Sequence, residues 1–186
     1  MQKTKKLYIL LTRFPDKTSR ALSFFAHSYY THASIGLEED MNTYYSFVCR
    51  GLFSFVCRGF IVEKIDRYNK PERAPLPCRL FVLSVSEKTY ARAKRILAEF
   101  EAQKKEYRYA RFGALMSLLH IPFATAHHYF CSQFVAKVLE GCQAVKLARR
   151  PSRYLPWDLA ALPGLSPVFE GNLAEYAETF SAVPAT

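Results

Sequence analysis

The sequence predicts an α+β fold in which an antiparallel sheet packs against helices. Short runs of aromatic and β-branched residues lie close together in the first half of the chain, which is typical of strands joined by hairpins. Later stretches instead repeat their apolar residues every three or four positions, which is typical of helices with one buried face. The 186 residues contain no linker or low-complexity tract, so we expect residues 1–186 to form a single domain.

Each expected element rests on a local pattern of this kind. Strands are expected at residues 7–12, 31–37, 44–48, 60–64, 79–85 and 168–170. Helices are expected at residues 17–27, 86–106, 110–119 and 131–142. The helix at residues 86–106 has a buried face formed by Tyr90, Ala93, Leu97 and Phe100. Asp158 is expected to cap a further short helix near the end of the chain.

The chain is basic, with a net charge of +10 from 26 basic and 16 acidic residues. The basic residues are scattered and no nucleic-acid-binding motif accompanies them. A solvated basic surface is therefore favoured over specific binding of nucleic acid. Attraction to an anionic membrane surface stays open as an alternative.

The five cysteines indicate a reducing compartment. Their number is odd and no CxxC pair occurs among them, so the spacing suggests neither a disulfide scaffold nor a zinc knuckle. No HExxH or comparable ligand spacing occurs either, and we expect no metal and no cofactor. The basic N-terminus is followed by an apolar run over residues 7–11 only, which is short for an export signal. Together these features predict a cytoplasmic protein.

A six-residue segment is repeated without change, since SFVCRG at residues 46–51 recurs at residues 54–59. Two copies at a period of eight are too few for a solenoid. Because eight is even, either copy could fill the same strand with its side chains on the same faces. We expect one copy to pair beside the strand at residues 31–37, and the other to extend the hairpin or loop out. Cys49 and Cys57 have no metal role in this interpretation.

Cys131 stands at the start of the expected helix at residues 131–142 and is in phase with its buried face. Unpaired N–H groups in a first helical turn carry partial positive charge and favour a thiolate, the reactive form of cysteine. A small buried core thiol is the alternative interpretation. The buried face comprises Phe134, Val135, Val138, Leu139 and Cys142, whereas Ser132 and Gln133 fall outside it.

His32 is the candidate partner of Cys131. In a strand at residues 31–37, His32 shares one face with Ser34 and Gly36, whose small size leaves room beside the imidazole. A thiol–imidazole pair needs little else, because the histidine takes the thiol proton and favours the thiolate. Nearby helix N–H groups can then stabilise the oxyanion that forms on attack at a carbonyl.

Two motifs resemble a known family. YTHASIG at residues 30–36, followed by YFCSQFV at residues 129–135, resembles the circularly permuted NlpC-like papain-fold group. This group includes YiiX-like bacterial proteins and, more distantly, relatives of lecithin:retinol acyltransferase, and it places the strand histidine before the helix cysteine. The resemblance covers roughly residues 7–142 and lies closest to small bacterial members. It implies a papain-like core and cysteine-dependent cleavage or transfer at an amide, ester or thioester.

The resemblance also implies a polar residue that orients the histidine. Many relatives place a glutamate on the strand after the histidine strand, and the aligned position here is Ser46, or Ser54 if the second copy fills that strand. A serine can hold an imidazole by a hydrogen bond but cannot stabilise imidazolium as a carboxylate does. The carboxylates that could substitute are Glu38, Glu39 and Glu63.

The sequence therefore favours a papain-like cysteine hydrolase of the amidase or peptidase type, or an acyltransferase. Cys131 is the expected nucleophile, His32 the general base and acid, and Ser46 the orienting residue, while His127 or His128 could line the cleft. The expected substrate is a small peptide, a lipid or an acyl compound. Two alternatives stay open: a catalytically silent member of the same fold that binds an acyl or peptide ligand, and a basic surface-binding protein in which Cys131 is a core thiol.

Overall fold

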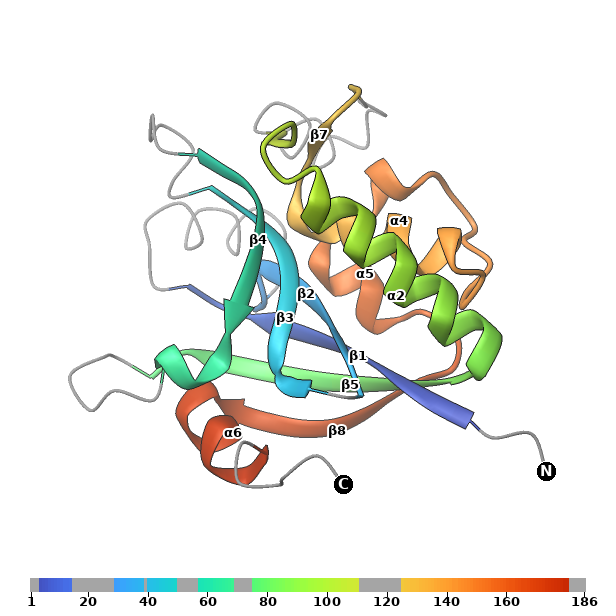
Figure 1. Cartoon of the computed structure of the whole chain (residues 1–186). Helices are drawn as coiled ribbons and strands as arrows, with labels where there is room; N and C mark the ends of the chain where they lie inside the picture. Colours follow the sequence, from blue (N-terminus) through green and yellow to red (C-terminus); the bar gives the residue numbers. More distant parts are fainter. Residues whose placement is uncertain are drawn as a thin grey trace.

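The computed structural model describes residues 4–14, 29–38, 40–49, 57–68, 75–110 and 125–180. They form the expected α+β fold, in which a six-stranded antiparallel sheet has helices on both faces (Figure 1). The order across the sheet is β4-β3-β2-β1-β5-β8, and β6 and β7 form a separate parallel pair. The strands are β1 (Thr4–Thr12), β2 (His32–Leu37), β3 (Asp40–Cys49), β4 (Cys57–Lys64), β5 (Pro77–Ser86), β6 (Arg108–Tyr109), β7 (His128–Tyr129) and β8 (Leu165–Asn172). The helices are α2 (Glu87–Ala102), α4 (Cys131–Gly141), α5 (Pro156–Ala160) and α6 (Leu173–Phe180), with short 3-10 turns η1 (Ile65–Tyr68) and η2 (Pro151–Arg153).

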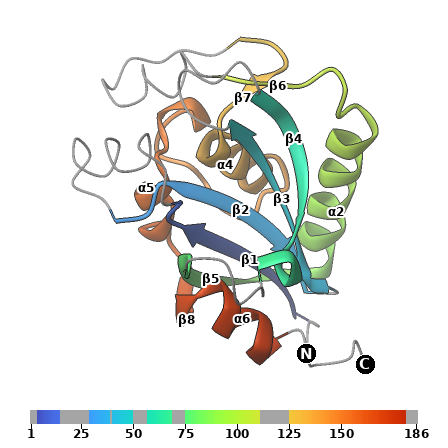
Figure 2. The same cartoon turned by 90° about the vertical axis from the view of Figure 1, so that its left-hand side faces the viewer.

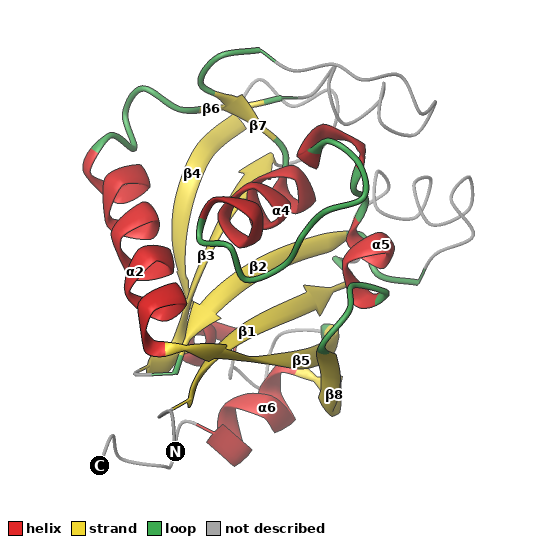
Figure 3. Ribbon diagram, turned by 90° about the vertical axis from the view of Figure 1, so that its right-hand side faces the viewer, coloured by secondary structure: helices red, strands yellow, loops and turns green. Residues whose placement is uncertain are grey.

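The larger core lies on the face of the sheet that α2 and α4 cover (Figure 3). Alternate residues of the central strands, such as Ile9 and Ile35, pack there against the apolar side of α4. Aromatic rings gather around Phe47, whose ring centroid lies 5.2 Å from that of Phe134 and 5.4 Å from that of Tyr129. Each large apolar side chain buried in this way contributes about 1.5–3 kcal/mol, so this packing fixes α4 over β2 and β3.

Helix α2 confirms the predicted pattern on the same face. Its buried residues are the four that the sequence analysis places on its core side. Ser86 caps the helix, because its side-chain oxygen accepts a hydrogen bond from Thr89 N at 3.2 Å. The helix ends at Ala102, four residues before the expected end at residue 106.

The opposite face of the sheet is covered by α6, a helix that the sequence analysis does not predict (Figure 2). Asn172 accepts hydrogen bonds from the N–H groups of Ala174 and Glu175, and Glu175 in turn accepts one from Asn172 N. This reciprocal arrangement is a capping box, and an Asn followed three residues later by Glu was its signal in the sequence. The fully buried Tyr176 then packs against Tyr44, and their hydroxyl oxygens lie 2.7 Å apart.

The small residues that share a face of β2 with His32 are covered by another part of the fold. All six residues of β2 are buried, including Ser34 and Gly36. A Cβ added at Gly36 would lie 2.7 Å from the ring of Tyr44, so this glycine is needed for the close approach of the two strands. The strand at residues 31–37 is therefore enclosed on both faces, because Tyr44 and α6 fill the side that the small residues leave free.

The two copies of the repeat lie in neighbouring strands. The first four residues of copy one end β3, which pairs with β2 as expected, and the last three residues of copy two begin β4. The described part of copy two thus extends the hairpin. Gly59, its last residue, meets the chain before β6 so closely that a Cβ would lie 2.1 Å from the backbone oxygen of Tyr107.

The remaining expectations divide into three groups. The strands at residues 7–12, 44–48, 60–64 and 79–85 are confirmed, and the strand expected at 168–170 is the longer β8. The short helix near Asp158 is α5, in which Asp158 accepts a hydrogen bond from Leu155 N at 2.8 Å. The expected helix at residues 17–27, residues 111–119 of the helix expected at 110–119, and both His27 and His120 lie outside the described residues. No helix in the described part of the chain is long and apolar enough to cross a membrane.

Candidate catalytic site

Cys131 is the first residue of α4, and the β6–β7 pair fixes the path of the chain that leads into this helix. Arg108 N donates to His127 O and Ala110 N donates to Tyr129 O, both at 2.9 Å. The β6 segment in turn rests on β4 at Gly59. The chain therefore enters α4 along a path held by the sheet.

The first turn of α4 is more deeply buried than its apolar pattern suggests. Ser132 and Gln133, which fall outside the predicted buried face, are 0% and 5% exposed. Gln133 uses its side-chain oxygen to accept a hydrogen bond from Phe130 N at 3.4 Å, which satisfies one backbone donor at the start of the helix. The turn is enclosed because α4 packs against η2 and α5 as well as against the sheet.

The structure brings the two predicted catalytic residues together. His32 and Cys131 come close enough for each side chain to shift the pKa of the other, although 99 positions separate them in the sequence. His32 is 6% exposed and Cys131 is 4% exposed. The ring of Phe14 meets that of His32 edge-on at a centroid distance of 5.2 Å. The pair thus lies at the start of β2, where the sheet meets the start of α4.

Local donors make Cys131 an acidic thiol. Burial alone would raise its pKa, but the hydrogen bond to His32 and the charge of the imidazolium lower it. Backbone N–H groups of Ala33 and Ser132 also donate to the sulfur and lower the pKa further. The pKa of Cys131 is below its usual value, which favours the thiolate.

The same contacts act in the opposite direction on His32. Burial alone would lower the pKa of the imidazole, but interactions with Cys131 and Glu63 outweigh it and raise the pKa to about 10. The pair therefore favours thiolate and imidazolium at neutral pH.

Glu63, rather than Ser46, lies beside the imidazole. Glu63 Oε2 is 3.7 Å from His32 Nε2, which is an ion-pair distance rather than a normal hydrogen bond, and both side chains are less than a tenth exposed. Ser46 Oγ instead donates to the backbone oxygen of Ala33 at 2.7 Å, so its proton is used in a hydrogen bond within the sheet. The orienting position expected for Ser46 is taken by a carboxylate, which can stabilise an imidazolium. Glu38, another expected substitute, accepts a hydrogen bond from Lys6 N instead.

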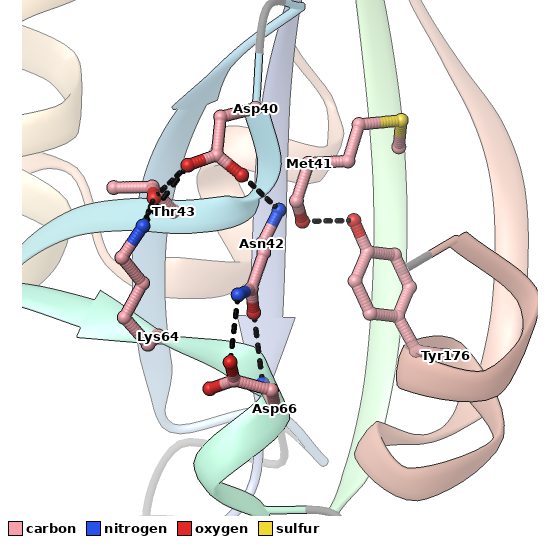
Figure 4. Close-up of polar contacts among 7 residues, drawn as sticks. All are labelled: Asp40, Met41, Asn42, Thr43, Lys64, Asp66 and Tyr176. Carbon is pink, nitrogen blue, oxygen red and sulfur yellow. Dashed lines mark hydrogen bonds and ion pairs between the residues drawn. The ribbon is translucent and has the colours of Figure 1, made fainter. Parts of the chain in front are cut away.

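A polar cluster holds the register of the strand that carries Glu63 (Figure 4). Lys64 donates to both Asp40 and Thr43, and Thr43 Oγ1 donates to Asp40. Burial acts to raise the pKa of Asp40, but the hydrogen bonds from Thr43, Lys64 and the N–H of Asn42 hold it below its usual range. Asn42 also bonds in both directions to Asp66, at 2.8 and 3.0 Å. Lys64 and Asp66, which follow Glu63 in the chain, are therefore tied to β3, and this helps to fix where the Glu63 side chain emerges.

The two histidines before α4 contact other groups. His127, with a positive φ of 61°, lies against the ring of Tyr107 at a centroid distance of 5.6 Å. His128 Nδ1 is 2.8 Å from the backbone oxygen of Ala126. The structure gives neither residue a contact with Cys131, and the cleft-lining role expected for one of them stays a prediction.

The described residues contain no group of three or more His, Cys, Asp or Glu side chains placed to hold a metal ion. A shallow pocket of about 440 Å³ lies between the β3–β4 hairpin and α2. It is lined by Leu37, Asp40, Thr43, Tyr45, Val62, Lys64, Lys94, Ala98 and Glu101. None of the three residues of the site faces this pocket, so it gives no information about a substrate of Cys131.

Comparison of the chain with family models, curated proteins and solved structures finds no match. The class of site is therefore defined by its own features: a buried thiol and a buried imidazole that shift each other's pKa, with a carboxylate beside the imidazole.

Proposed function

We propose that this protein is a cysteine hydrolase or acyltransferase that acts on an amide, ester or thioester through Cys131 and His32. The main support is the buried pair in which interaction with His32 lowers the pKa of the thiol and interactions with Cys131 and Glu63 raise the pKa of the imidazole to about 10. A thiolate is the attacking form of cysteine, and an imidazolium beside it can protonate a leaving group. The order of the two motifs supports the finer assignment to a permuted papain-like fold of the NlpC-like group.

The proposed reaction proceeds in two steps. Cys131 Sγ attacks the substrate carbonyl, and N–H groups of the first turn of α4 stabilise the resulting oxyanion. His32 gives its proton to the leaving amine, alcohol or thiol, which leaves an acyl group on the sulfur. Neutral His32 then removes a proton from water, for hydrolysis, or from another acceptor, for transfer, and the acyl group leaves Cys131.

Glu63 is the proposed positioning residue of this reaction. Its carboxylate lies 3.7 Å from His32 Nε2 and is 7% exposed, so little solvent screens its charge. It stabilises the imidazolium that forms with the thiolate and fixes the ring in the plane that reaches Cys131. The free thiols of Cys78, Cys131 and Cys142 are compatible with the proposed cytoplasmic location.

A second candidate function is binding of an acyl or peptide ligand without catalysis. The deep burial of both partners favours it, because a substrate carbonyl must reach a sulfur whose residue is only 4% exposed. The two functions differ in whether a covalent acyl–sulfur bond forms.

A panel of acyl probes separates the two functions. Fluorogenic ester, thioester and amide compounds with short and long acyl groups are incubated with the wild-type protein and with Cys131→Ala, and bound acyl groups are located by mass spectrometry. Acylation of Cys131 with release of the leaving group, absent from Cys131→Ala, is the expected result. Saturable ligand binding that is equal in both proteins, without acylation, would establish the binding function and overturn the enzyme. Cys142→Ala is the matched control for loss of a helix thiol.

A further inference from the structure

We propose that Arg13 binds a negatively charged group of the substrate, so that Cys131 reacts in preference with acyl compounds that carry a carboxylate or a phosphate. Arg13 directly follows β1 and is partly exposed. The inference rests on the proposed function, because it specifies the compounds that Cys131 attacks.

The register of the sheet places Arg13 near Cys131. The N–H of Ala33, which lies directly opposite Leu11, donates to the sulfur of Cys131. Arg13 follows Leu11 by two residues, or about 7 Å along an extended strand. Its N–H donates to Pro77 O at 3.0 Å, which continues the pairing of β1 with β5 by one residue. Alternate residues of a strand share a face, so Arg13 belongs with Leu11 to the side of the sheet that α4 covers (Figure 3).

The two neighbours of Arg13 hold it against the other partner of the pair. Thr12 lies directly opposite His32 in the register of β1 and β2. The ring of Phe14 meets the ring of His32 edge-on at a centroid distance of 5.2 Å. Arg13 thus stands in a segment that is fixed beside the catalytic histidine, while its own side chain belongs to the face of the thiol.

An aromatic ring, and not a carboxylate, orients the Arg13 guanidinium. Cζ lies 4.6 Å from the ring centroid of Tyr29, which is 53% exposed. No carboxylate of the described residues lies within ion-pair distance of this guanidinium, whereas Arg79, Arg95 and Arg149 each pair with one.

This arrangement suits an anionic ligand. A ring stacks on the face of a guanidinium, whereas carboxylates and phosphates bind at its N–H edge, so both can contact Arg13 together. Arginine side chains remain charged in proteins, and the whole chain carries a net charge of +10. A positive charge beside the thiol therefore favours substrates with a negative charge near the carbonyl that is attacked.

Two alkylating reagents that differ in charge test the proposal without any acyl turnover. Iodoacetate has a carboxylate where iodoacetamide has a neutral amide. With both, the Cys131 thiolate forms a sulfur–carbon bond and iodide leaves with the electrons of the carbon–iodine bond. At pH 7 and low ionic strength, the ratio of the iodoacetate rate to the iodoacetamide rate at Cys131 should be about 10-fold higher in the wild-type protein than in Arg13→Gln, because one hydrogen-bonded charge pair is lost.

Matched variants separate Arg13 from general charge and from folding. Arg95→Gln removes a positive charge from α2 and should keep the wild-type ratio, and Arg13→Lys, which retains the charge, should keep a ratio above that of Arg13→Gln. Unchanged iodoacetamide rates show that each variant keeps an intact thiol site. Equal ratios in the wild-type protein and Arg13→Gln would overturn the proposal. An equal fall in Arg95→Gln, or no difference between Arg13→Lys and Arg13→Gln, would overturn it as well.

Ester probes connect the anion site to the proposed function. Fluorogenic esters with acyl chains of matched length end in a carboxylate, a phosphonate or a neutral amide, and acylation of Cys131 is followed by mass spectrometry. One or both charged chains should react about 10-fold faster than the neutral chain in the wild-type protein, and this preference should be lost in Arg13→Gln. The faster of the two charged chains identifies carboxylate or phosphate as the preferred group.

The two reactions fail in different ways. Acylation of Cys131 at rates that depend neither on chain charge nor on Arg13 would overturn this inference and leave the proposed function intact. No acylation by any of the three esters would overturn the proposed function, and the alkylation ratio would still decide whether Arg13 binds an anion.

Discussion

Helix α4 has a cysteine at each end, and the two differ in their acidity although both are buried. Cys131 begins the helix and is 4% exposed, and Cys142 follows its last residue and is 0% exposed. Burial raises the pKa of Cys142, whose sulfur donates a hydrogen bond to Leu139 O at 3.4 Å. Burial acts in the same direction on Cys131, but the hydrogen bond to His32 and the charge of that imidazole outweigh it and lower the pKa of Cys131.

The comparison shows that the histidine partner decides the state of a buried thiol here, because backbone N–H groups act to lower the pKa of both thiols and His32 reaches only Cys131. At the start of a helix the backbone presents N–H groups, which stabilise an anion, and at its end it presents carbonyl oxygens, which hold a thiol proton. His32 adds a cationic partner at the first end only. The same helix can thus anchor one inert core thiol and present one activated thiol.

The largest expected effect is a difference in alkylation between these two cysteines. Iodoacetamide at pH 7 should label Cys131 about 10- to 100-fold faster than Cys142, since the thiolate reacts and low-pKa thiolates are somewhat less nucleophilic. Cys78, whose pKa is raised to about 12 by burial and by the charge of Glu175, should react as slowly as Cys142. Rates are measured residue by residue by mass spectrometry.

Equal labelling of Cys131 and Cys142 at neutral pH would remove the distinction between the two ends of α4. Unfolding the protein in urea is the control, because all cysteines should then react at similar rates.

The second effect follows from removal of His32. His32→Gln should slow the alkylation of Cys131 about 10-fold at pH 7, because the thiolate loses both a hydrogen bond and a positive charge. The thiolate absorbance of Cys131 should then rise at a higher pH than in the wild-type protein. A rate that does not change, in a variant with wild-type unfolding behaviour, would show that helix N–H groups alone activate the thiol.

The sequence predicts the two partners of this pair but not the carboxylate behind them. His32 and Cys131 stand in short motifs whose local pattern is visible along the chain, and each lies at the start of its element. Glu63 follows three apolar residues in β4, and its approach to His32 depends on the order of three strands and on which copy of the repeat enters β3. Placement across neighbouring strands leaves no local pattern in the sequence. The position that aligns with the orienting glutamate of the resembling family is Ser46, and the sequence therefore favours Ser46 instead of Glu63.

The helix that covers the second face of the sheet is not predicted from the sequence, for a related reason. Helix α6 has a capping signal at Asn172 and Glu175. It is only eight residues long, however, and its apolar face can be interpreted only once the position of the sheet is known. Without α6, the small residues beside His32 indicate open space rather than packing against Tyr44. Local patterns thus gave the elements, while the enclosure of β2 needed tertiary contacts.

The third effect separates Glu63 from Ser46. Glu63→Gln should lower the pKa of His32 from about 10, because the imidazolium loses a buried negative partner, and should reduce acyl turnover about 10-fold. The pKa is measured by following the His32 ring resonances by NMR as the pH rises. Ser46→Ala is the matched control: it removes the bond to Ala33 O, costs about 1 kcal/mol of stability, and should leave the His32 titration unchanged.

A shift of the His32 titration in Ser46→Ala as large as that in Glu63→Gln would contradict this assignment. The orienting role would then belong to the serine, as the aligned position in the sequence suggested.

The smallest expected effect is on stability as a function of pH. His32 has a raised pKa, so its contribution is complete below pH 6.5 and is lost as the pH rises to about 10. Cys131 has a lowered pKa, so its contribution is complete above pH 9 and is lost as the pH falls through the folded pKa. Above both pH 6.5 and the folded pKa of Cys131, and up to pH 9, the pair holds one proton in the folded and in the unfolded chain, and the two slopes cancel.

Urea unfolding of the wild-type protein and of the double variant Cys131→Ala, His32→Gln isolates this contribution. The difference in free energy of unfolding should be flat over this pH range and should fall by up to about 1.4 kcal/mol per pH unit on either side, the limit for one proton. Cys142→Ala supplies the contrast from the other end of α4. A thiol whose pKa is raised loses its contribution only as the pH rises above 9, so this variant should show no loss on the acid side. A steady slope across this pH range in the double-variant difference would mean that thiol and imidazole titrate independently, and Cys131 would then differ from Cys142 in degree only.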